Sequence, residues 1–72
     1  MASLASQEGF ARNLRRARER ADLSQEALGE RCGLHRTEIS FLERGLRDPR
    51  LSTIIRLAEG LGIPPGQLIK GL

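Results

Sequence analysis

The stretch from Ser24 to Gly45 decides the fold, and its sequence is SQEALGERCGLHRTEISFLERG. Ser24 predicts the start of a helix, because its hydroxyl oxygen can accept a hydrogen bond from an unpaired backbone N–H. Gly33 predicts the end of that helix, since glycine adopts the left-handed conformation without steric cost. The stretch therefore predicts two short helices, over residues 25–32 and 36–44, joined by a tight turn.

Neither of these two helices is long enough to be stable alone, because isolated helices shorter than about 12 residues are marginal in water. Each must therefore pack against the other and against a core. Gly29 is expected on the inner side of the first helix, where the absence of a side chain lets the second helix approach closely. The apolar side chains expected to face inward are those of Leu28, Cys32, Leu34, Ile39 and Leu42.

Apolar residues continue at helical spacing on both sides of this stretch. Residues 1–8 show no sustained pattern and are expected to form a flexible N-terminal arm, and a helical period begins at Gly9. Ser52 is expected to cap a later helix that ends at Leu61, and the Pro–Pro pair that follows is expected to open a short last helix. The apolar faces of these three helices consist of Phe10, Leu14, Ala17 and Ala21, then Ile54, Ile55, Ala58 and Leu61, then Leu68, Ile69 and Leu72. The sequence predicts an all-α fold of five short helices in a single domain, residues 9–72.

Composition narrows the classes of function. The chain has 72 residues and a net charge of +3, and eleven of its twelve basic residues are arginine. Arginine grips phosphates and guanine edges bidentately, although codon bias in a GC-rich genome would give the same excess. A single cysteine and a single histidine, Cys32 and His35, argue against an internal disulfide and a zinc site, so we expect no metal, no cofactor and no enzyme activity. The lack of a signal sequence and of a long apolar run favours a cytoplasmic protein that is not bound to a membrane.

The residues from Ser24 to Gly45 resemble the helix-turn-helix of phage repressors and of the related bacterial regulators of the xenobiotic-response-element (XRE) family. The resemblance extends over about residues 10–69, and the segment LRDPRLSTIIRLAEGLGIPPGQL fits the family's last two helices. It implies a lambda-repressor-like domain that binds double-stranded DNA in a sequence-specific manner and regulates transcription as a repressor or a controller. Within the family, GLHRTEIS followed by LERG is most similar to the controller proteins of restriction–modification systems.

The resemblance also implies that helix 36–44 docks in the major groove of DNA. At about 100° per residue, Ile39 and Leu42 define the inner side of this helix, which leaves Thr37 and Phe41 on the outer side. The residues expected to contact bases are Arg36, Thr37, Ser40 and Phe41. The residues expected to contact phosphates are Ser24, Gln25, Arg44, Arg47 and Arg50. Alternatively, Arg36 contacts phosphate, the Thr37 hydroxyl bonds to the backbone, or Arg50 enters the minor groove between half-sites. In the simplest alternative each arginine is solvated, and Phe41 packs against a neighbouring loop or helix.

Two positions depart from the family pattern. His35 replaces a small capping residue, and Glu38 replaces the aromatic residue that is typical of controller proteins. Because a carboxylate is repelled by nearby phosphates, Glu38 is expected at a solvated flank of the helix, unless it accepts a hydrogen bond from cytosine N4. The family pairs an arginine of its first helix with the glutamate of the ERG segment, which implies an ion pair of Arg18 with Glu43 that orients the recognition helix.

One recognition helix contacts too few base pairs to select a site in a genome, so two copies related by a two-fold axis are expected on a pseudo-palindromic operator. The family dimerises through the end of the domain, where this chain offers Leu68, Ile69 and Leu72 as the homodimer interface. Of these, Leu68 is expected to close the domain's own core, which leaves the other two facing water in a monomer. Alternatively, all three side chains complete the core of a monomer. RNA polymerase or a toxin would be a further protein partner, and a toxin partner would make the chain an antitoxin, which is the alternative function.

Overall fold

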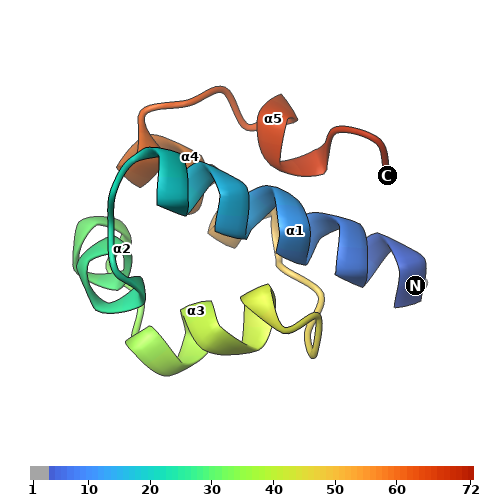
Figure 1. Ribbon diagram of the computed structural model, residues 1–72, viewed down its shortest axis with the longest axis horizontal. Helices are drawn as coiled ribbons and strands as arrows, with labels where there is room; N and C mark the ends of the chain where they lie inside the picture. The colour runs from blue at the N-terminus through green and yellow to red at the C-terminus, as the bar shows by residue number, and fades with distance from the viewer. Residues whose placement is uncertain (1–3) are drawn as a thin grey trace.

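Five helices account for most of the chain. The computed structural model describes residues 4–72, with side chains from Ser6 onward. In chain order the helices are α1 (Leu4–Arg20), α2 (Gln25–Cys32), α3 (Arg36–Glu43), α4 (Leu51–Leu61) and α5 (Gly66–Ile69). Figure 1 shows α1 across the middle of the molecule, with α3 packed on one side of it and α5 on the other. Because the described residues form helices and no strand, the predicted all-α fold is confirmed.

Helix α1 begins at Leu4, earlier than the expected start at Gly9. Residues 4–8 of the predicted flexible arm are therefore helical, and residues 1–3 of that arm lie outside the described residues. Gly9 belongs to the interior of the helix, where a Cβ would overlap the side chain of Leu72 that packs over this turn. The apolar period could not reveal the earlier start, because it begins only where side chains reach the core.

The two helices of the motif meet as predicted. Ser24 is the N-cap of α2, and its hydroxyl oxygen accepts a hydrogen bond from the N–H of Ala27 at 3.0 Å. Gly33 ends α2 in the left-handed conformation, with a φ of 71°. A Cβ at Gly29 would lie 2.5 Å from the carbonyl oxygen of Leu34. The backbone of the turn therefore packs directly against Gly29, because any side chain at this position would clash with it.

Helix α4 begins at Leu51, so Ser52 lies in its first turn and the predicted serine cap is wrong. The N-cap is Arg50, which has an extended backbone and makes no side-chain cap hydrogen bond. Helix α4 therefore starts without a side-chain cap, and its buried residues are Leu57 and Ala58. Gly62 ends α4 with a φ of 68°, as predicted.

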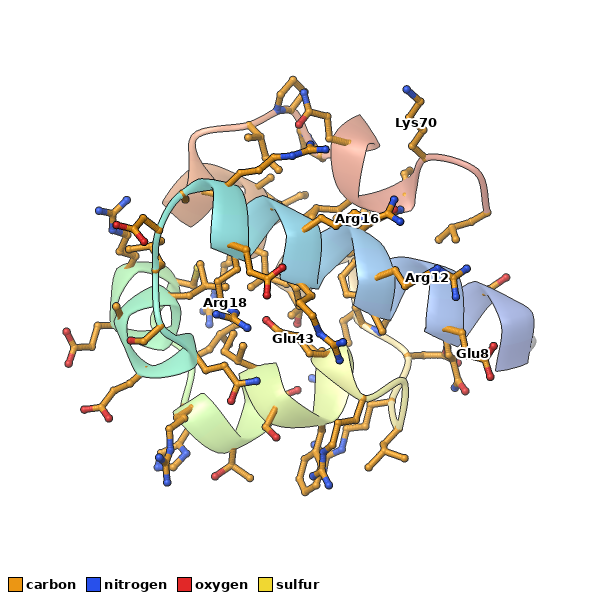
Figure 2. All side chains as sticks on the ribbon, viewed as in Figure 1. Glu8, Arg12, Arg16, Arg18, Glu43 and Lys70 are labelled. Carbon is orange, nitrogen blue, oxygen red and sulfur yellow. The ribbon has the colours of Figure 1, made fainter. Side chains whose placement is uncertain are left out.

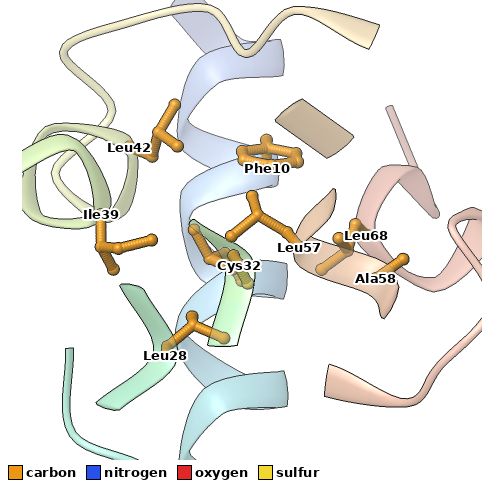
Figure 3. Packing of buried hydrophobic residues seen from close by; sticks show 9 residues of the cluster. Phe10, Leu28, Cys32, Ile39, Leu42, Leu57, Ala58 and Leu68 are labelled. Atoms are coloured by element: carbon orange, nitrogen blue, oxygen red, sulfur yellow. The ribbon is translucent and has the colours of Figure 1, made fainter. Parts of the chain in front are cut away.

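The core lies between α1, the motif helices and the last two helices, as Figure 3 shows. Its buried side chains are those of Phe10, Leu14, Leu28, Cys32, Ile39, Leu42, Leu57, Ala58 and Leu68. Ala21 is exposed instead of buried, because the chain leaves α1 at that point and turns with a φ of 58° at Asp22. Ile55 is also exposed, because no other described element covers its end of that helix face. Burial raises the pKa of the Cys32 thiol, so this side chain is a neutral part of the core.

Candidate DNA-binding surface

Helix α3 begins at a histidine cap. Nδ1 of His35 accepts a hydrogen bond from the backbone N–H of Thr37 at 3.0 Å. The imidazole thus replaces the hydroxyl or carboxylate oxygen that a small capping residue provides. The departure from the family pattern at this position therefore preserves the start of the helix. Arg36 follows the cap directly and is exposed, and no other described residue forms a hydrogen bond or ion pair with its side chain.

Helix α3 has one buried face and one accessible face. Ile39 and Leu42 are buried in the core, as the helical period predicts. Thr37 is exposed, and Ser40 and Phe41 are half-buried. The residues expected to contact bases therefore lie together on the accessible side of the helix, and Arg36 is the first of them. Their contact with bases remains a prediction.

Phe41 lies against two arginine side chains. The guanidinium carbon of Arg47 is 4.7 Å from the centroid of the Phe41 ring, and that of Arg44 is 5.2 Å from it. At these distances a cation is attracted to the face of an aromatic ring. Nη1 of Arg47 also forms an ion pair with Oε1 of Glu38 at 3.4 Å. Glu38 therefore lies at a flank of the helix that solvent reaches, as expected, and the loop after α3 folds back so that Arg47 pairs with its carboxylate.

The residues expected to contact phosphates lie where α2 begins and where α3 leads into α4; they are Ser24, Gln25, Arg44, Arg47 and Arg50. The Ser24 oxygen accepts the cap hydrogen bond, which leaves its hydroxyl proton available to an acceptor. Arg47 and Arg50 line a polar hollow of about 660 Å³, together with Arg56 of α4. Arg56 was not predicted, because a lone arginine on a polar helix face has no local signal that distinguishes it from a solvated one.

A buried carboxylate connects the first three helices. Glu43 accepts two hydrogen bonds from Arg18, at 2.6 Å from Nε and 2.9 Å from Nη2, so the predicted ion pair is confirmed (Figure 2). The side-chain amide of Gln25 donates to the same carboxylate at 3.2 Å, and Arg15 donates to the backbone carbonyl oxygen of Glu43 at 3.0 Å. The hydrogen bond with Glu43 raises the pKa of Arg18. The role of Arg15 was missed, although its spacing of three residues from Arg18 put both on one side of α1.

Several large apolar side chains are exposed on α4 and at the C-terminal end. Leu51, Ile55, Ile69 and Leu72 have exposed fractions of 73, 43, 47 and 53%. Leu68, by contrast, is fully buried, so it closes the domain's own core as expected, and its place in the predicted dimer interface is wrong. Nδ2 of Asn13 donates to the carbonyl oxygens of Leu68 and Lys70, each at 3.0 Å, which holds α5 on α1. The exposure of Leu51 and Ile55 was missed, since a helical period gives the direction of a side chain but not whether another element covers it.

The described part of the chain contains neither a helix that could span a membrane nor a cluster of metal ligands. None of the helices within residues 4–72 is both long and apolar enough to cross a bilayer. The same residues include no group of three or more His, Cys, Asp or Glu side chains that could hold a metal ion.

Known proteins have sequences similar to this chain and the same arrangement of helices. The HTH_3 family model, described as a helix-turn-helix, matches residues 14–68. The control protein C.BamHI of Bacillus amyloliquefaciens is 39% identical over 61 residues, which cover 83% of this chain and 75% of that protein. The control protein C.SmaI of Serratia marcescens is 45% identical over 60 residues, which cover 83% of this chain and 71% of that protein. The crystal structure of the restriction-modification controller protein C.AhdI from Aeromonas hydrophila matches with a TM-score of 0.86 at 39% identity, over 89% of this chain and 97% of that one.

Proposed function

The chain belongs to the HTH_3 helix-turn-helix family of DNA-binding transcriptional regulators, and we propose that it acts as a homodimer on a pseudo-palindromic operator. The predicted resemblance to regulators of this type, and among them to controller proteins, is confirmed. Because C.BamHI, C.SmaI and C.AhdI are named as control or controller proteins, we infer that the genes regulated by this chain belong to a restriction–modification system.

The accessible face of α3 is the observation that supports major-groove recognition. Arg36 begins this face with its guanidinium group unpaired among the described residues, so it is available to donate to O6 and N7 of guanine. Thr37 offers a hydroxyl and a methyl group one residue further on. The half-buried Phe41 ring, which Arg44 and Arg47 hold in place from over the ring, can meet a thymine methyl group.

Phosphate contacts follow from the cations that surround this face. Arg47 and Arg50 line one hollow beside the start of α4, and Arg56 joins them there. Ser24 and Gln25 open α2, whose first backbone N–H groups and helix dipole attract anions. We propose that these groups hold the DNA backbone while α3 contacts the bases, which makes affinity depend steeply on salt.

Dimerisation would cover the apolar side chains that a single chain exposes. Ile69 and Leu72 lie at the end of the domain, as the sequence predicts for an interface. Leu51, Ile55 and Ala58 follow one side of α4, and Ala58 belongs to the same buried cluster as Leu68 of α5. A hollow that is lined by Ile54 of α4 together with Ile69 and Leu72 connects α4 with the end of the chain, and we extend the proposed interface along α4 to Leu51 and Ile55. Burying this surface between two copies is favourable by about 25 cal/mol per Å² of apolar area, and the entropic cost of association reduces this gain.

Selection of operators from a library of random duplexes tests the function directly. We expect a pseudo-palindromic site, and Arg36→Ala should cost about 1–3 kcal/mol and relax the preference at one base position of each half-site. Arg20→Ala removes an equally charged, exposed side chain from α1, on the side next to α5, and should leave operator binding unchanged. If the Arg36 variant loses affinity equally for cognate and scrambled DNA, Arg36 contacts phosphate and not a base. If no sequence is enriched, the proposed function is wrong.

Sedimentation of two aspartate variants tests the dimer. Ile69→Asp introduces a charge into the proposed interface and should shift the protein towards monomer. Leu46→Asp introduces the same charge at a similarly exposed leucine of the α3–α4 loop, with 58% of its surface accessible, and should remain dimeric. Ile69→Asp should also weaken operator binding far more than non-specific binding. A wild-type protein that stays monomeric at high concentration, both free and on a palindromic site, would contradict the proposal.

A further inference from the structure

A basic groove lies between α1 and α5. It has a volume of about 470 Å³ and is lined by Asn13, Arg16, Ala17, Arg20, Gln67 and Lys70. The two hydrogen bonds that Asn13 donates to the backbone of α5 fix the two walls relative to each other. The relative position of α1 and α5, which form the two walls, is therefore fixed by the folded chain.

The cations of this groove continue along α1. Arg12, Arg16 and Arg20 follow each other at intervals of four residues, which places them on one side of the helix about 6 Å apart along its axis. Like charges at this spacing destabilise a helix by about 0.2–0.5 kcal/mol per pair. Among the described residues no carboxylate forms an ion pair with any of them or with Lys70, although Glu8 and Glu19 belong to the same helix. The fold therefore retains an uncompensated row of positive charge.

The groove faces away from the proposed DNA-binding surface. Figure 2 shows Arg16 and Lys70 on the α5 side of α1, whereas Arg18 and Glu43 lie between α1 and α3. Arg15 and Arg18 thus use their charge within the protein, on the α3 side of the helix. DNA bound along α3 cannot reach the opposite side of α1, so phosphate contact with the same operator does not account for the row.

We propose that the α1–α5 groove binds an acidic segment of a protein partner while α3 holds the operator. Carboxylates at every fourth residue of a helix, or at alternate residues of an extended chain, repeat at about 6–7 Å and match the spacing of the arginines. Such carboxylates project on side chains and can enter the recess between the helices. The phosphates of a second duplex belong to a rigid, broad backbone that cannot enter a recess of this volume between two helices.

The test uses the full chain and three fluorescent probes in anisotropy titrations at low salt. The first probe is a helix-forming alanine peptide of about 15 residues with Glu at every fourth position, the second is its Gln counterpart, and the third is a random duplex. The groove variant is Arg16→Gln/Arg20→Gln/Lys70→Gln. The charge-matched variant is Arg36→Gln/Arg47→Gln/Arg50→Gln, which removes three cations from the DNA-binding surface.

We expect the Glu peptide, and not the Gln peptide, to bind the wild-type chain, and the groove variant to lose about tenfold or more in peptide affinity while it keeps operator binding. The charge-matched variant should show the reverse, which separates a failure of this proposal from a failure of the proposed DNA binding. Amide shifts induced in the wild-type protein by the Glu peptide should fall on α1 and α5, which gives a second measurement that needs no variant. Equal losses of the peptide in both variants, shifts confined to α3, absence of peptide binding, or capture of a second duplex through the groove would each overturn the proposal.

Discussion

Two arginine–glutamate pairs attach α3 to the rest of the molecule, and they differ in burial and geometry. The pair of Arg18 with Glu43 is bidentate, and its side chains are 15% and 2% exposed. The pair of Arg47 with Glu38 has a single contact at 3.4 Å, and its side chains are 55% and 34% exposed. The first pair belongs to a network that also includes Gln25, whereas the second is exposed to solvent beside Phe41. The buried arginine–glutamate pair therefore orients α3, whereas the exposed pair is a contact that other groups can replace.

Desolvation explains why the two pairs should behave differently. Removing one partner of a buried pair leaves an uncompensated charge in a medium of low dielectric constant, which costs about 3–5 kcal/mol. An exposed pair contributes about 0–1 kcal/mol, because water and salt screen it and its long side chains lose entropy. The Arg47 guanidinium can therefore exchange Glu38 for a DNA phosphate at little cost, whereas Arg18 cannot leave Glu43.

The largest effect is expected for Glu43→Ala. We predict that it lowers the free energy of unfolding by about 3–5 kcal/mol, because Arg18 is left buried without its carboxylate. Urea denaturation monitored by circular dichroism measures this loss. Glu38→Ala is the matched control and should cost less than about 1 kcal/mol. Similar losses in the two variants would show that burial does not distinguish the pairs.

Replacing both members of the buried pair should restore much of this stability. In Arg18→Met/Glu43→Leu no buried charge remains, and apolar side chains of similar size often replace such a pair without loss. Recovery should be incomplete, because the carbonyl oxygen of Leu23 loses the hydrogen bond that Nη1 of Arg18 donates to it at 2.8 Å. A double-mutant cycle with the two single variants measures the coupling, which we expect to exceed about 2 kcal/mol. Additive losses would mean that the two side chains contribute independently.

The sequence predicts these two pairs unequally well, for a physical reason. The Arg18–Glu43 pair was predicted because the resemblance to the family implies it. The Arg47–Glu38 pair depends on how the α3–α4 loop folds back, and the loop has no period from which its path could be deduced. The start of α4 at Leu51 was missed because no side chain caps it, so the sequence carries no local signal for it. The inward residues of α3 were predicted because direction and burial coincide in the middle of the motif.

A smaller effect is expected at the turn that sets the angle between α2 and α3. Gly29→Ala should lower the free energy of unfolding by about 1–3 kcal/mol, because its Cβ would lie 2.5 Å from the carbonyl oxygen of Leu34, and backbone cannot move aside easily. Thermal unfolding measures this loss. Gly66→Ala is the matched control, since nothing lies near a Cβ there and its backbone has no positive φ. A tolerated alanine at position 29 would show that the turn does not constrain α3, and would leave its orientation to the Glu43 network alone.

The smallest effect on stability, and the most informative one for DNA binding, is expected for Glu38→Gln. We predict a change in unfolding free energy below about 0.5 kcal/mol, because the pair is exposed. Operator affinity should rise a few-fold, since the variant removes a negative charge near phosphates and frees Arg47 from its competing carboxylate.

Salt titrations of operator binding separate these two causes. Arg47→Ala should reduce the slope of log K against log salt by about 0.9, the share of one phosphate. In that background Glu38→Gln should retain only the part of its gain that comes from relieved repulsion. If instead Glu38→Gln weakens binding and relaxes the preference at one base pair, Glu38 accepts a hydrogen bond from cytosine N4 in the complex. Arg47 would then pair with Glu38 only in the free protein, and Glu38 would contact a base in the complex. The buried pair would orient α3, whereas the exposed pair would take part in sequence recognition.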